Sequence, residues 1–78
     1  MEEHIMSVTR YERRARDYVR NLYEDYLYAR SKHDRELTNS TFSTYYNGMA
    51  MLKAMFPYST NEEHLETMWE AIYKRENS

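Results

Sequence analysis

Histidine is the first residue type to examine for chemistry, because it is both a common metal ligand and a general base near neutral pH. The chain has three histidines, His4, His33 and His64. None of them has a second His or a Cys three or four residues away, which is the spacing that presents two ligands from one helical turn. The spacing therefore predicts no metal site.

The neighbouring pair His33 and Asp34 has the residue types of a general base and an orienting carboxylate. Adjacent residues on a helix point about 100° apart, however, and no Ser or Cys nucleophile stands in a recognisable setting. With a single Gly, the chain cannot form a P-loop or a dinucleotide fingerprint. We therefore expect a non-enzymatic protein with no catalytic residue and no cofactor.

Arginine is concentrated near the N-terminus, in the cluster Arg10, Arg13, Arg14, Arg16 and Arg20. Acidic residues lie among these arginines at helical pairing distance, in four combinations: Glu12 with Arg16, Arg13 with Asp17, and Arg20 with Asp17 or Glu24. Much of the positive charge is then balanced along one helix surface, so we favour a solvated face. The alternative function is nucleic-acid or nucleotide binding, with phosphates on Arg13, Arg16 and Arg20 and nearby tyrosines stacking on bases.

The C-terminal segment is acidic, with Glu62, Glu63, Glu66 and Glu70. As the recognition helix of a helix-turn-helix motif, this segment would be repelled by phosphates. Its glutamates are instead a candidate docking face for a basic groove on a larger protein. A small regulator or inhibitor of that kind, of the sort carried by phages and other mobile elements, is therefore one expectation for function.

Composition favours helices. The 78 residues include one Gly and one Pro, so they lack the usual breakers of long helices, and there is no Cys to form a disulfide. Leu, Ile, Val and Phe supply only eleven residues, whereas Tyr and Met supply fifteen. The net charge of -2 is too small for a disordered chain. We predict a single all-α domain over residues 1–78 whose small core is completed by self-association.

Three amphipathic segments are expected at about residues 8–32, 41–56 and 61–75. In the first, which we expect to be one long helix packed against two shorter ones, apolar residues recur at steps of three and four and include Tyr11, Tyr18 and Tyr26. Thr9 with Glu12 has capping-box spacing. The first helix either breaks within residues 31–34 or continues to about residue 37, because His33 and Leu37 extend its stripe.

The second segment can be capped by Asn39, Ser40 or Thr41, and it ends at about residue 55 or 56, ahead of Pro57. Its inward stripe contains Phe42, Tyr45, Tyr46, Met49, Leu52 and Phe56. Lys53 is also on the inner side, either as a snorkelling side chain, which we favour, or as a contact. In the third segment, Ser59 with Glu62 or Thr60 with Glu63 has capping-box spacing, and the inner stripe is Leu65, Met68, Trp69 and Ile72.

Four apolar side chains have no partner within these stripes: Leu27, Tyr28, Met51 and Met55. Leu27 and Tyr28 project to the flank and the polar side of the first helix, and the two methionines project to the outer side of the second. Aromatic residues and Met are enriched at protein interfaces. We therefore expect these four residues to form a protein interface, first of all between copies of the chain. The alternative is that the third helix covers them.

No membrane association is expected, because the longest apolar run, Met49 to Leu52, is far too short to span a bilayer. The N-terminus is acidic where a secretory signal would be basic. We expect a cytoplasmic protein. Asn39, Ser40 and Thr41 match a glycosylation sequon, which we interpret as a polar cluster at a helix start.

Overall fold

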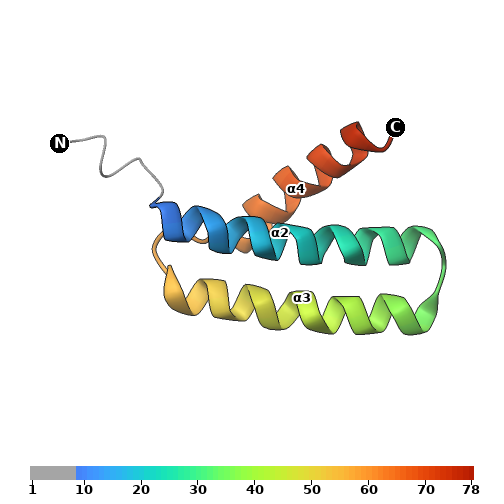
Figure 1. Cartoon of the computed structure of the whole chain (residues 1–78), viewed down its shortest axis with the longest axis horizontal. Helices are drawn as coiled ribbons and strands as arrows, with labels where there is room; N and C mark the ends of the chain where they lie inside the picture. The colour runs from blue at the N-terminus through green and yellow to red at the C-terminus, as the bar shows by residue number, and fades with distance from the viewer. Residues whose placement is uncertain (1–8) are drawn as a thin grey trace.

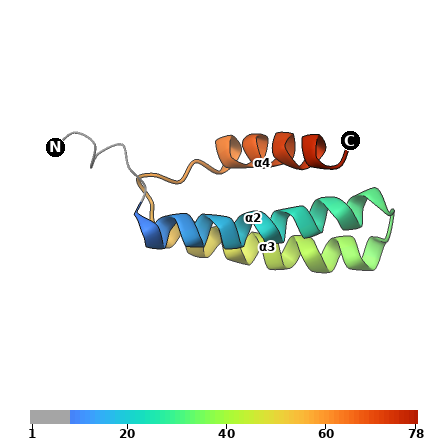
Figure 2. The ribbon, with the colours of Figure 1, turned by 45° about the horizontal axis from the view of Figure 1, so that its top comes forward.

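The computed structural model describes residues 9–78, which form three helices and no strand. The helices are α2 (Arg10–Ser31), α3 (Arg35–Met55) and α4 (Glu62–Glu76). α2 and α3 run antiparallel side by side (Figure 1), and α4 lies on one side of this hairpin as a second layer (Figure 2). The all-α prediction is confirmed for these residues. His4 and the predicted helix start at residue 8 lie outside them.

α2 begins and ends through local hydrogen bonds. The Thr9 hydroxyl accepts a hydrogen bond from the backbone N–H of Glu12 at 3.1 Å, which confirms the predicted cap. At the other end, the N–H of Lys32 bonds to carbonyls of the last turn, and His33 has a φ of 58°. This left-handed conformation reverses the chain, so a helix that continues to residue 37 is wrong.

α3 begins six residues earlier than predicted. The side chain of Asp34 accepts a hydrogen bond from the N–H of Leu37 at 3.0 Å and caps the helix, so a start near residue 41 is wrong. Asn39, Ser40 and Thr41, the residues expected to cap this helix, lie inside it. Thr38, Thr41 and Thr44 donate their hydroxyl protons to the carbonyls four residues earlier. α2 and α3 therefore have 22 and 21 residues, and only α4, with 15, is short.

The connection from α3 to α4 lies where the sequence predicts it, but a different residue caps α4. α3 ends at Met55, ahead of Pro57. α4 is capped by Asn61, whose side chain accepts a hydrogen bond from the N–H of His64 at 3.0 Å. Ser59 and Thr60, the predicted caps, bond elsewhere, Thr60 to the carbonyl of Phe56.

Ser59 joins the loop after α3 to the first turn of α2. The hydroxyl of Ser59 donates to the carboxylate of Glu12, which is buried. Arg16 lies 3.3 Å from the same carboxylate and donates to the backbone carbonyl of Ser59 at 2.6 Å. Because a buried carboxylate needs compensating hydrogen bonds, this network fixes the loop at the end of the hairpin from which α4 departs.

The core contains eight residues from all three helices: Val19, Tyr23, Leu27, Tyr45, Met49, Leu52, Leu65 and Trp69. On α2 the buried residues follow Val19, Tyr23 and Leu27, a stripe rotated away from the predicted one. Tyr11 and Tyr18, predicted to point inward, are exposed, and Tyr26 is half-buried. The reason is that α2 contacts both α3 and α4, so that its buried side faces two neighbours.

The inward stripes of α3 and α4 are narrower than predicted. Tyr45, Met49 and Leu52 are buried, but Phe42 and Tyr46 are exposed. On α4, Leu65 and Trp69 are buried, whereas Met68 is exposed. α4 makes few direct contacts with α3, so Phe42 and Tyr46 on α3 and Met68 on α4 stay uncovered. Among residues 9–78, no helix is long and apolar enough to cross a membrane.

The left-handed conformation of His33 makes a prediction about stability. A residue with a Cβ loses roughly 1–2 kcal/mol in this conformation, whereas Gly adopts it freely. We expect His33→Gly to raise the free energy of unfolding by about 0.5 kcal/mol, because the relief of strain exceeds the added entropy of the unfolded chain. Urea denaturation at a fixed protein concentration measures the change.

Lys32→Gly is the matched control, because Lys32 has an ordinary φ of -91°. There the same substitution relieves no strain, adds the entropic cost and removes the contact of Lys32 with the ring of Tyr28, so it should lower stability by roughly 0.5–1 kcal/mol. Equal destabilisation by the two variants would contradict the prediction.

Candidate interaction surface

α3 carries a long stretch without charge. From Leu37 to Leu52, sixteen consecutive residues include no Lys, Arg, Asp or Glu, although such residues make up 31% of the chain. Ten of the sixteen are exposed, among them Phe42, Tyr46 and Met51. We call these ten positions the α3 face. Depletion of charge together with exposed aromatic residues and Met is the composition of an interface core.

A groove between α2 and α3 borders the α3 face. Its rim consists of the exposed side chains Tyr18, Met51 and Met55, and its floor of Ala15, Val19, Gly48 and Leu52. We call it the methionine groove. It has a volume of about 80 Å³, and none of its lining residues is charged or belongs to α4. Met51 and Met55, predicted as interface residues, are 65% and 58% exposed and lie together here.

Gly48 lets the two helices approach closely at this groove. A Cβ at this position would lie 2.8 Å from Cδ1 of Leu22 and 3.6 Å from Cγ2 of Val19. The first distance is shorter than van der Waals contact, so any larger residue would displace the side chain of Leu22. The single Gly of the chain therefore sets the depth of the methionine groove.

Tyr18 was missed as an interface residue because the periodicity places it on the inward stripe. It is 63% exposed, and Tyr11, seven residues earlier and therefore on the same side of α2, is also exposed. The sequence signal for this surface is the uncharged run of α3, because an exposed helix without charge needs a covering surface on each side. Tyr18 lies beside that run in the structure, since it lines the methionine groove together with Met51.

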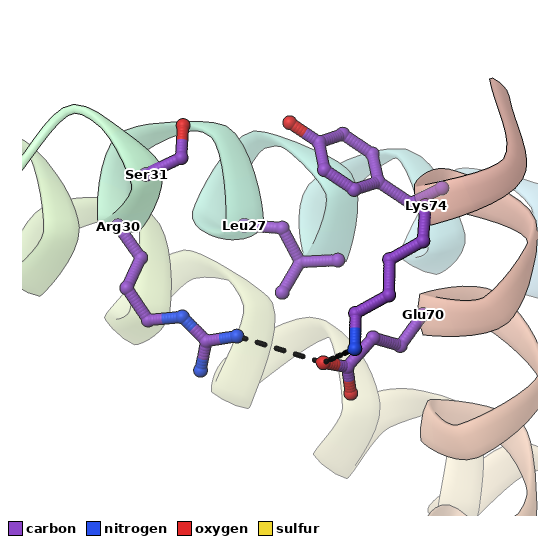
Figure 3. A pocket seen from close by; sticks show the side chains of 6 residues that line it. Leu27, Arg30, Ser31, Glu70 and Lys74 are labelled. Carbon is purple, nitrogen blue, oxygen red and sulfur yellow. Dashed lines mark ion pairs between the residues drawn. The ribbon is translucent and has the colours of Figure 1, made fainter. Parts of the chain in front are cut away.

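Leu27 and Tyr28, which were predicted to lie in one interface, have different surroundings in the structure. Leu27 is only 4% exposed, because α4 lies over this side of α2, so the expectation that it has no partner within the chain is wrong. It lines a pocket of about 210 Å³ in which Arg30 of α2 and Lys74 of α4 both point to the carboxylate of Glu70 (Figure 3). The ion-pair distances are 3.7 Å and 3.5 Å. Tyr28 is exposed, with Nζ of Lys32 lying 5.3 Å from its ring centre.

The four glutamates of the predicted acidic face do not form one free surface. Glu62 lies 3.0 Å from Nζ of Lys53, Glu66 accepts a hydrogen bond from Tyr45, and Glu70 pairs with Arg30 and Lys74. Glu63 is exposed and has no ion pair within residues 9–78. Lys53 is exposed and its ammonium pairs with Glu62 of α4, so it makes a contact between the two helices.

The three arginines named as phosphate ligands come together. Arg13, Arg16 and Arg20 line one groove between α2 and α4, which we call the arginine groove. The predicted pairs are confirmed for Arg16 with Glu12 at 3.3 Å and for Arg20 with Glu24 at 3.8 Å. No ion pair with Asp17 is found within the described residues.

Tyr45 is the most buried tyrosine, at 1% exposure, and all three helices meet around it. Its ring lies 4.9 Å from that of Tyr23 on α2, and its hydroxyl donates to Oε2 of Glu66 on α4 at 2.5 Å. Burial and the hydrogen bond to Glu66 raise the pKa of Tyr45 far above its ordinary value of 10.0. Burial and the charge of Glu70 raise the pKa of Tyr23 to about 12.

Within residues 9–78, no three His, Asp or Glu side chains are grouped so that they could hold a metal ion. Comparison with known proteins finds no matching family model, no matching curated protein and no matching solved structure.

The buried tyrosines predict a loss of stability at high pH. Above pH 10, the unfolded chain loses tyrosine protons that the folded chain retains, so the free energy of unfolding falls as the pH rises towards 12 and beyond. Each such tyrosine contributes a slope of up to about 1.4 kcal/mol per pH unit. Denaturation measured between pH 9 and about 11.5 tests this.

Tyr45→Phe should remove one such contribution and flatten the slope. At neutral pH it should also lower stability by about 1.5 kcal/mol, because a hydrogen bond to a charged group is lost. Tyr58→Phe, at a fully exposed side chain, is the control and should leave the profile as in the parent protein. An unchanged slope in Tyr45→Phe would sink the prediction.

Proposed function

We propose that the protein is a small non-enzymatic interaction module that self-associates through the α3 face and the methionine groove. The observation that carries this proposal is the uncharged stretch from Leu37 to Leu52, most of which is exposed. A water-facing helix of this length normally carries charges on its outer side. A helix face without them is suited to burial against another protein.

The absence of charge favours a second copy as the partner. In a dimer with two-fold symmetry, each residue near the axis meets its own counterpart, so a charged residue there faces a like charge. The α3 face avoids this repulsion, because its ten positions lie in a run of sixteen residues without charge. The outer surfaces of α2 and α4 do not, because Arg14, Asp25 and Glu63 are exposed there.

The methionine groove supplies the apolar anchor. Tyr18, Met51 and Met55 are exposed around a floor that contains no polar side chain. Methionine adapts to the shape of a partner, and tyrosine adds large contact area with a polar tip. Self-association also supplies apolar burial that a chain of this size lacks on its own. A regulatory role towards a larger protein is compatible with this proposal, because α4 and the arginine groove stay uncovered.

Replacement of Met51 by Lys tests the proposal. Burial of a Met side chain is worth about 1.5–3 kcal/mol, and a symmetric dimer contains the substitution twice, so the dissociation constant should rise by at least about a hundredfold. Sedimentation velocity over a concentration series should show a dimer of the parent protein at about tens of micromolar and a monomer of Met51→Lys.

Met68→Lys is the matched control, because Met68 is an exposed methionine on α4 outside the methionine groove. It should dimerise as the parent protein does. Circular dichroism should show that both variants stay helical. A folded parent protein that remains monomeric throughout the series, or a Met68→Lys variant that dissociates as readily as Met51→Lys, overturns the proposal.

A further inference from the structure

The arginine groove is a second surface, separate from the methionine groove. It runs between α2 and α4 and has a volume of about 260 Å³. α4 provides an apolar side made of Met68, Trp69 and Ile72, of which Trp69 is buried at 3% exposure and Met68 is exposed. α2 provides the opposite side, with Arg13, Arg16, Asp17 and Arg20. The groove thus places guanidinium groups directly beside apolar surface.

The three arginines differ in how many of their donors are used. Arg16 is held by Glu12 and by the carbonyl of Ser59. Arg13 is exposed and has no ion pair within residues 9–78. Arg20 has one ion pair in the described part of the chain, in which its buried Nε lies 3.8 Å from Glu24. Since a guanidinium has five N–H donors, Arg13 and Arg20 can each bind a further carboxylate.

We propose that the arginine groove binds a short acidic peptide segment of another protein. An apolar side chain of the peptide packs on Met68 and Ile72, and flanking carboxylates pair with Arg13 and Arg20. Both halves of this recognition are needed, because a surface ion pair alone contributes little affinity, whereas an apolar anchor excludes water from the charges beside it. Arg16, already bonded to Glu12 and Ser59, supports the wall of the groove.

The same residues disfavour a nucleic acid as the occupant. Asp17 lies between the arginines in the groove, so evenly spaced phosphates would meet a like charge. The ring of Trp69 is buried and offers no open face on which a base can stack. A peptide can place its carboxylates at Arg13 and Arg20 and an uncharged residue near Asp17.

Selection from a display library of short random peptides on the full-length protein tests this inference. The selected peptides should combine at least two Asp or Glu residues with a bulky apolar residue. Fluorescence anisotropy of a selected, labelled peptide then gives its affinity for the parent protein and for variants. Arg13→Glu should weaken binding at least about tenfold, because an attractive charge becomes a repulsive one at an exposed position.

Arg14→Glu is the matched control: it makes the same change of charge at the next residue, which is exposed but does not line the groove. It should change the affinity by no more than about twofold, as expected for a screened charge away from the contact. Met51→Lys should bind the peptide as the parent protein does, so this inference and the proposed self-association can fail separately.

Three outcomes would overturn the inference. The first is a selection that yields no binding peptides or peptides without acidic residues. The second is an equal loss of affinity in Arg13→Glu and Arg14→Glu. The third is displacement of the bound peptide by a single-stranded oligonucleotide with a steep dependence on salt, because it would assign the groove to phosphate.

Discussion

The hydroxyl of Tyr45 is the point on which the arrangement of the three helices depends. Its ring is buried against Tyr23 of α2, and a buried hydroxyl must find a hydrogen-bond partner, which is the carboxylate of Glu66 on α4. α3 and α4 have few other direct contacts. The position of Glu66 therefore sets the rotation of α4, and with it the burial of Leu65 and Trp69.

A second polar network acts at the end of the hairpin. Glu12, Arg16 and Ser59 hold the start of α2 to the loop after α3, close to where α4 departs. α4 lies against α2 and leaves the arginine groove open between the two helices. The ionic residues of the chain are thus gathered on α2 and α4, and α3 is left without charge over most of its length. The fold separates one uncharged surface from one charged groove.

Much of this fold could be predicted from the sequence, because helix periodicity, the scarcity of Gly and the position of Pro57 are local signals. The start of α3 could not. The residues from Thr38 to Thr44 have weak helix propensity, and hydroxyls that bond back to the preceding turn keep them helical. Asp34 was available as a cap, but its neighbour His33 also continued the stripe of α2, and periodicity cannot reveal a left-handed residue.

The candidate site was predicted in part for a related reason. The outward positions of Met51 and Met55 follow from one helix alone, whereas the burial of Leu27 and the exposure of Tyr18 depend on where α4 packs. A hydrophobic stripe shows how wide the buried arc is, but not how two neighbouring helices divide it. The gathering of Arg13, Arg16 and Arg20 in one groove again depends on α4, since Trp69 and Met68 form its other side.

The loose attachment of α4 has a consequence for how the molecule opens. α2 and α3 are joined by a short connection and contact each other along their length, while α4 touches mainly α2. Detachment of α4 breaks fewer contacts than separation of α2 from α3 and can precede unfolding of the hairpin. Amide hydrogens in α4 should therefore exchange through an opening of lower free energy than those in the middle of α2. We expect the α2–α3 hairpin to form first during folding, because its contacts are more local in sequence than those between α2 and α4.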